Sequence, residues 1–216
     1  MENMIYVLGI GNNTPVLIDL ATACGYKIAG LYHYKEGRTG ETEHGYKIIG
    51  SFDDMFKSGV RNRNFLLTMG DSKIRTEMAD KIIERGGGVP TLIHPNANVS
   101  QFACISDICV YVFAFADIQA DTKIGRCTYI APHVQICHMC HIGESCFIAA
   151  AAVIGSYTHV DDFVFVGQGA ISISGKVNTI GKNAIIAAGA LLTKDVPASA
   201  MMVGSPAKSS ILFSKL

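Results

Sequence analysis

Aliphatic residues recur at every sixth position through much of the second half of the chain. The series runs Ile118, Ile124, Ile130, Ile136, Ile142, Ile148, Ile154, Val160 and Val166. Four positions after each comes a small or β-branched residue, such as Thr122 or Cys140. A helix (period 3.6) or an ordinary strand (period 2) loses phase with this pattern within two repeats. The pattern therefore predicts a parallel β-helix built from hexapeptide rungs.

Three hexapeptides of this kind close a triangular coil of about 18 residues, with the aliphatic side chain pointing inward. Each buried Ile or Val contributes roughly 1.5–3 kcal/mol, so the stacked column is the main expected source of stability. The register returns at Ile180 after a slip near Ser172–Gly175, which predicts a loop there. We expect residues 96–117 to form an irregular capping coil, and Asp195–Ala198 to end the array.

The first ninety residues show a different pattern, in which short apolar runs alternate with helical segments. We expect strands at 4–8, 27–34, 46–50 and 65–69, and helices at 16–24 and 73–85. Such alternation is typical of an α/β domain with a parallel sheet. The strand ends at Gly9–Asn13, Tyr32–Tyr34 and Met69–Ser72 should meet at one edge, where ligands of open parallel sheets bind.

The loop after the first strand reads Gly9-Ile10-Gly11-Asn12-Asn13-Thr14-Pro15. Glycine loops of this kind present backbone N–H groups to phosphate at a helix N-terminus. The pattern is incomplete because Thr14 stands where a third glycine would be. A tight strand-to-helix turn without a ligand is the structural alternative.

Composition narrows the choice of partner and compartment. Eighteen basic and eighteen acidic residues give a net charge of zero, which argues against nucleic-acid binding. The chain shows neither a signal segment nor a run of 18 apolar residues, so we expect a cytoplasmic protein away from the membrane. Its seven cysteines are expected to be reduced thiols.

At the level of motifs, the chain resembles the sugar acetyltransferases of the bacterial sialic acid and bacillosamine pathways. The resemblance rests on the Gly9-Ile10-Gly11 loop, the Leu92-Ile93-His94-Pro95 junction, the hexapeptides, and Val203-Gly204-Ser205-Pro206-Ala207. It implies a Rossmann-like nucleotide-sugar-binding domain (residues 1–90), then a left-handed β-helix acyltransferase domain with a C-terminal tail (residues 91–216). It also implies a homotrimer that moves an acetyl group from acetyl-CoA to an amine or hydroxyl of a nucleotide-linked or sialic-type sugar, without a metal.

The same resemblance assigns the catalytic histidine. The family's histidine lies two residues after a rung aliphatic, and here that segment reads Ile136-Cys137-His138-Met139. His138 therefore falls on the catalytic position, at an outward corner. Imidazole exchanges protons near neutral pH, which suits a general base that takes the proton of the attacking amine or hydroxyl.

Other family positions match in part. Family members follow the catalytic histidine with an acidic residue, whereas this chain has Met139; Met139 itself and His141 are the candidates for supporting His138. By the same matching, acetyl-CoA would meet Phe147 (a histidine in family members), Gln168 and Ala187. The matched substrate-binding positions are Gly9, Gly11, Asn12, Asn13, His33, Tyr34 and Gly70, with His33-Tyr34 replacing an acidic pair.

Two other functions remain open from the sequence. His133 and His138 have a spacing seen in γ-class carbonic anhydrases, which use the same prism and bind zinc between subunits; His94 is the one upstream candidate for a third ligand. A catalytically weakened sugar-nucleotide-binding protein is the other alternative, because Met139 and Phe147 depart from the family pattern.

Overall fold

The computed structural model describes residues 3–210 and divides the chain into two compact units, Met1–Leu92 and Ile93–Leu216. The sequence placed the boundary between residues 90 and 91. The expected C-terminal tail, from residue 211 onward, lies outside the described residues.

The first unit is a five-stranded sheet with helices between the strands. Its sheet order is β3-β4-β2-β1-β5, parallel except for the antiparallel pair β3–β4. The strands are β1 (Met4–Leu8), β2 (Lys27–His33), β3 (Thr42–Glu43), β4 (Tyr46–Ser51) and β5 (Asn64–Leu67). The helices are α1 (Thr14–Ala23), the short 3₁₀ helix η1 (Glu36–Arg38), α2 (Phe52–Ser58) and α3 (Ser72–Glu84).

Local chemistry explains where these helices begin. Ser51 and Asp54 form a capping box at α2, and the Asp71 carboxylate accepts from the first N–H groups of α3. Helix α1 differs, because Asn13 caps it without a side-chain hydrogen bond and Pro15 lies in its first turn. The Thr14 N–H donates to the Gly11 carbonyl (3.0 Å) and Pro15 has no N–H, so among the described residues the Val16 N–H is the first-turn donor of α1 that stays available to a ligand.

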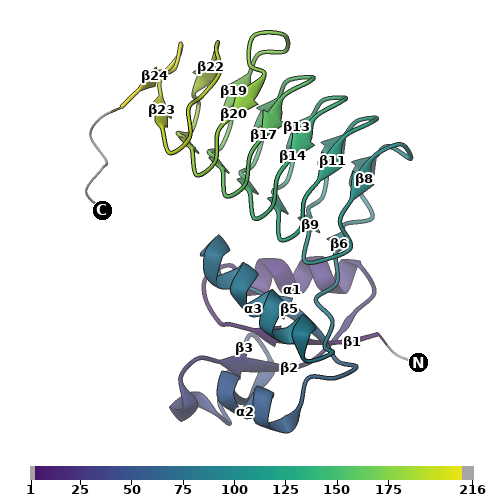
Figure 1. Cartoon of the computed structure of the whole chain (residues 1–216). Coiled ribbons are helices and arrows are strands. Elements are labelled where there is room, and N and C mark those ends of the chain that lie inside the picture. The colour runs from purple at the N-terminus through teal and green to yellow at the C-terminus, as the bar shows by residue number, and fades with distance from the viewer. Residues whose placement is uncertain (1–2, 211–216) are drawn as a thin grey trace. The chain divides into compact units, whose positions relative to one another are not determined.

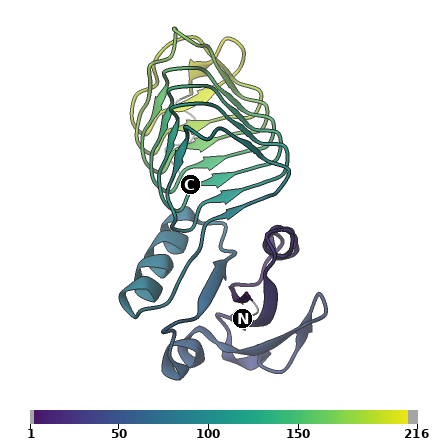
Figure 2. The same cartoon turned by 90° about the vertical axis from the view of Figure 1, so that its right-hand side faces the viewer.

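The second unit is the prism that the six-residue period predicts (Figures 1 and 2). Its strands form three parallel sheets, with one antiparallel strand at the end. The six-stranded sheet holds β7 (Asn98–Val99), β10 (Asp117–Ile118), β13 (Gln135–Ile136), β16 (Val153–Ile154), β19 (Ile171–Ser172) and β22 (Leu191–Leu192). The five-stranded prism sheet holds β8 (Cys104–Ile105), β11 (Lys123–Ile124), β14 (His141–Ile142), β17 (His159–Val160) and β20 (Thr179–Ile180). The eight-stranded sheet holds β6 (Leu92–Ile93), β9 (Tyr111–Val112), β12 (Tyr129–Ile130), β15 (Phe147–Ile148), β18 (Phe165–Val166), β21 (Ile185–Ile186), β23 (Met201–Val203) and β24 (Lys208–Ser209).

Side chains in the prism follow the predicted phase. Ile118, Ile136 and Ile154 stack inward from successive coils and are almost fully buried. The small residues of the turns, such as Thr122 and Cys140, are buried as well. This continuous apolar column is the core of the unit.

The backbone turns through the left-handed region once in most rungs. Met139 (φ 57°) and Tyr157 (φ 65°) are examples, and both lie at outward turns. These conformations place the residue before each of them, including His138, at a corner of the prism.

Two details of the array differ from the sequence interpretation, and a third agrees with it. Residues 96–117 form regular rungs rather than an irregular cap, and one extra residue between β8 and β9 shifts their phase. The array continues past Asp195–Ala198 to β23, because Met202 fills one more buried inward position. The slip near Ser172–Gly175 is a loop, as expected, between β19 and β20.

Candidate active site

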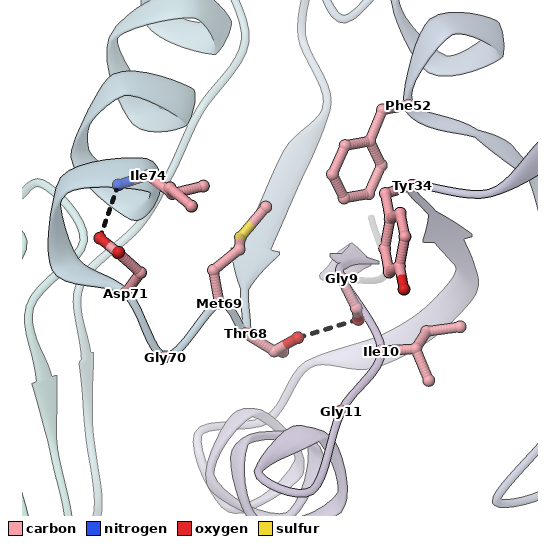
Figure 3. A pocket seen from close by; sticks show the side chains of 10 residues that line it. All are labelled: Gly9, Ile10, Gly11, Tyr34, Phe52, Thr68, Met69, Gly70, Asp71 and Ile74. Carbon is pink, nitrogen blue, oxygen red and sulfur yellow. Dashed lines mark hydrogen bonds between the residues drawn. The ribbon is translucent and has the colours of Figure 1, made fainter. Parts of the chain in front are cut away.

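Two regions carry the sequence-derived site residues, one in each unit. The first is a cavity at the carboxyl ends of the parallel strands of the N-terminal unit (Figure 3). Its volume is about 450 Å³. The residues that line it are Gly9, Ile10, Gly11, Tyr34, Phe52, Thr68, Met69, Gly70, Asp71 and Ile74. It lies at the carboxyl end of β1, which has β2 as its neighbour on one side and β5 on the other. At this point the strand order changes direction, and open parallel sheets bind ligands at such points.

Hydroxyl groups hold the Gly9–Thr14 loop in shape. The Gly11 N–H donates to Thr14 Oγ1 (2.8 Å), and Thr68 Oγ1 donates to the Gly9 carbonyl (2.8 Å; Figure 3). Gly9 has a φ of 98°, and a Cβ there would lie 3.1 Å from Thr68 Oγ1, so glycine suits the position. Thr14 thus closes the turn where a third glycine was missing.

Backbone donors of this loop point to an anionic ligand. Among residues 3–210, the N–H groups of Ile10, Asn12 and Asn13 have no hydrogen-bond partner. They precede the uncapped N-terminus of α1, where the helix dipole favours negative charge. Asn12 and Asn13 do not line the cavity itself.

Aromatic side chains form the other side of the cavity. Tyr34 is 64% exposed and lines it together with Phe52. His33 is buried instead, with its ring 4.3 Å from that of Tyr34 and its Nδ1 accepting from the Lys35 N–H (2.9 Å). Of the predicted pair, Tyr34 is therefore the residue that faces the cavity.

His138 lies on one edge of the prism, which we call the first edge. This edge consists of the turns that join the six-stranded sheet to the five-stranded prism sheet, residues 100–103, 119–122, 137–140, 155–158 and 173–178. The His138 side chain is exposed, and its backbone N–H donates to Gln119 Oε1 (3.1 Å). Its Nδ1 lies 3.2 Å from Ser156 Oγ, and its ring meets Tyr157 edge-on with centroids 5.3 Å apart.

The two predicted supporting residues have other surroundings. Met139 is half exposed at the turn. His141 lies on the five-stranded prism sheet, where its ring is 4.6 Å from that of His159. Burial, His159 and Lys123 together lower the pKa of His141. The hydrogen-bond partner of the His138 ring is Ser156, which the sequence interpretation did not single out.

The residues assigned to acetyl-CoA share a different part of the prism. Phe147 belongs to an outward aromatic stack on the eight-stranded sheet, 4.5 Å from the Tyr129 ring and 5.5 Å from the Phe165 ring. Gln168 and Ala187 lie in the second edge, the turns that join the eight-stranded sheet to the six-stranded sheet (residues 131–134, 149–152, 167–170 and 187–190). Within one chain, these three residues and His138 therefore lie on different sides of the prism.

The histidines of the zinc alternative do not share one edge either. His133 lies in the second edge, where its ring stacks on Phe115 at 5.1 Å, whereas His138 lies in the first. His94 Nδ1 accepts from the Asn96 N–H (3.0 Å). In the part of the chain that the structure describes, no three His, Cys, Asp or Glu side chains gather in a group that could hold a metal.

Some site residues were missed, and a signal for them existed. Ser156 stands 18 residues after His138, one full coil, so coil arithmetic would have placed it beside the histidine. Phe52 and Thr68 follow or end parallel strands, as cavity residues of such sheets do. Between residues 3 and 210, none of the helices combines the length and the apolar composition that a membrane crossing needs.

Comparisons with known proteins find sugar N-acetyltransferases among the relatives of this chain. No family model matches it. It is 28% identical over 214 residues to GDP-perosamine N-acetyltransferase of Escherichia coli O157:H7, a match covering 95% of this chain and 96% of the relative.

Solved structures give the same picture. The PerB structure from Caulobacter crescentus, in complex with CoA and GDP-perosamine, has a TM-score of 0.85 at 27% identity, covering 95% of this chain and 96% of that one. The acetyltransferase domain of PglB from Neisseria gonorrhoeae has a TM-score of 0.85 at 25% identity, covering 96% and 100%. These homologues and structural neighbours belong to the hexapeptide-repeat acyltransferases, the group that the sequence resembles.

Proposed function

We propose that this chain, a homologue of the hexapeptide-repeat sugar N-acetyltransferases, moves an acetyl group from acetyl-CoA to the amine of a nucleotide-linked sugar. The observation that carries the proposal is His138, an exposed imidazole held at a prism corner by Ser156 and Tyr157. The relatives act on nucleotide-linked amino sugars or bind CoA, which fits this chemistry.

His138 would act as the general base. As the sugar amine attacks the thioester carbonyl, the new C–N bond forms, the C–S bond breaks, and His138 takes the amine proton. The proton then passes to the leaving thiolate, so that CoA departs as a thiol. Positioned acid–base catalysis of this kind contributes about 10²–10⁴-fold to a rate.

The cavity of the N-terminal unit would bind the nucleotide. The free N–H groups of Ile10, Asn12 and Asn13 and the N-terminus of α1 suit a diphosphate. Tyr34 and Phe52 offer ring faces on which a base stacks. Asp71 brings a carboxylate to the same lining: its Oδ1 accepts from the Lys73 and Ile74 N–H groups, and its Oδ2 can accept from a sugar hydroxyl.

We infer the finer fold in the same way: a Rossmann-like first unit and a left-handed prism. The support for the first is the strand order, in which β1 lies between β2 and β5 with a glycine loop after it. The support for the second is the likeness to PerB and PglB. Reduced thiols at all seven cysteines suit the cytoplasm.

A homotrimer would complete the site. His138 on the first edge and Gln168 and Ala187 on the second can act on one acetyl-CoA only when they come from neighbouring copies. The exposed Phe165, Ile171 and Ile185 give the prism outward apolar surface that such copies would cover. Sedimentation at micromolar concentration should give the mass of three chains, and a monomer would refute the shared site.

A substrate panel tests the reaction. Purified protein with acetyl-CoA is offered GDP- and UDP-linked amino sugars, matched hydroxy sugars and free sialic-type sugars, while thiol release is followed. We expect turnover with a nucleotide-linked amino sugar and a product one acetyl group heavier. Nucleotide binding without thiol release across the panel would instead favour the weakened binding protein that Met139 suggests.

A further inference from the structure

We propose that Ser156 is the positioning residue of His138: its hydroxyl holds Nδ1 and thereby leaves Nε2 as the atom that takes the substrate proton. The inference rests on the proposed function and assigns a residue that replaces the missing acidic partner at position 139.

The geometry singles out this pair. Ser156 Oγ lies 3.2 Å from His138 Nδ1, and Ser156 is only 7% exposed although it lies at an edge of the prism. Within residues 3–210, neither atom has another hydrogen-bond partner. The two residues are one coil apart, so the rigid stacking of the prism fixes their separation.

The serine is itself held in place by the loop between β19 and β20. The Ser156 N–H donates to Ser174 Oγ (2.9 Å), and the Gly155 N–H donates to Ser172 Oγ (2.8 Å). This turn, residues 173–178, is two residues longer than the other turns of the first edge, and Ser174 lies in it. Tyr157 contacts the imidazole edge-on, so the ring is restrained by a second neighbour.

The tautomer of the His138 ring sets which group donates in the hydrogen bond with Ser156. A base that works through Nε2 needs a lone pair there, so the neutral ring must carry its proton on Nδ1. The Ser156 oxygen then accepts from Nδ1–H, both before the reaction and when the ring is an imidazolium. If the bond ran the other way, Nε2 would carry the proton and could not act as the base.

The test compares Ser156→Ala with Ser156→Thr, which keeps the hydroxyl. We expect the alanine variant to lose about 10- to 100-fold in kcat, the usual weight of a hydrogen bond to a charged group. Its KM for both substrates should stay within about twofold of wild type. Threonine should restore most of kcat. Ser100→Ala is the matched control, because Ser100 lies on the same edge and its Oγ accepts only from a nearby backbone N–H, that of Phe102.

A spectroscopic reading separates positioning from a merely structural role. In ¹⁵N-histidine-labelled protein, the neutral His138 ring should show a protonated Nδ1 in wild type and in Ser156→Thr, and a mixture of tautomers in Ser156→Ala. If the alanine variant does not fold, Ser156→Cys, with its weaker hydrogen bond, takes its place with a smaller expected loss.

The outcomes distinguish the two claims. Wild-type kcat in Ser156→Ala, or an Nε2-protonated neutral ring in wild type, would overturn the positioning role while the acetyltransferase stands. Full activity in His138→Ala would overturn both, since there would be no base to position.

Discussion

Two buried thiols fill inward turn positions of the prism and have raised pKa values. Burial raises the pKa of Cys140 to about 11 and that of Cys146 to about 12, since a thiolate is poorly solvated there. Each S–H donates to a backbone carbonyl of the next coil, Gly155 and Asp161 respectively, at 3.1 Å. These cysteines are packing residues rather than nucleophiles.

This assignment predicts a selective alkylation pattern. With iodoacetamide at pH 8, the folded protein should be modified at the exposed Cys104 and spared at Cys140 and Cys146, because the thiolate is the reactive form and is scarce at these two sites. Peptide mass spectrometry locates the label, and a urea-unfolded sample is the control in which all three react. If Cys140 in the folded protein were labelled as fast as Cys104, the Cys140 thiol would be accessible to solvent, which would contradict its assignment as a packing residue.

At the scale of single residues, the sequence predicts the position of His138 but not the residues that surround it. The hexad phase placed the imidazole at an outward turn because every rung repeats one backbone geometry. Its partner Ser156 is 18 residues away in the sequence. The hydrogen bond from the Ser156 N–H to Ser174 Oγ depends on a loop that interrupts the six-residue period. Likewise, buried His33 accepts a hydrogen bond at Nδ1 from the Lys35 N–H, and no pattern in the sequence predicts this contact.

Coil stacking leaves no room for a side chain at certain rung positions. A Cβ on Gly143 would lie 2.8 Å from the Asp161 carbonyl carbon and 2.7 Å from Asp162 Oδ1. Gly125, Gly155 and Gly167 meet backbone of the next coil in the same way. These glycines set the close approach of the coils and do not serve a turn.

Replacing one of them should therefore destabilise the prism. We expect Gly143→Ala to lower the free energy of unfolding by about 1–3 kcal/mol through overpacking. Gly37→Ala is the control, since nothing lies within 4 Å of its added Cβ, and its effect should stay below about 0.5 kcal/mol. Urea and thermal unfolding measure both, and equal stability of the two variants would contradict the stacking argument.

Elements were predictable wherever one period was strong and unbroken. The strands from β10 to β18 follow directly from the six-residue spacing, and the main helices from their caps and glycines. The hairpin strand β3 and the helix η1 escaped, because two or three residues carry no periodicity. The first coil was misread because a single inserted residue between β8 and β9 shifts the phase of a pattern that is otherwise intact.

On the scale of the whole molecule, the proposed function assigns substrate recognition to one unit and the chemistry to the other. The N-terminal unit supplies a cavity with free N–H donors and aromatic faces. The prism holds His138 on one edge and the positions proposed for acetyl-CoA elsewhere, so the proposed reaction needs two copies of the chain to act together.

The most direct test of the assignment of the base is the rate of CoA release by His138→Ala. It is measured with the nucleotide-linked amino sugar that the wild-type protein uses best. His159→Ala serves as the control, because His159 is an exposed histidine on the outer face of the five-stranded prism sheet. We expect kcat of His138→Ala to fall by at least about 100-fold with unchanged circular dichroism, while the control keeps wild-type activity. A folded His138→Ala variant that works within twofold of wild type would contradict the account.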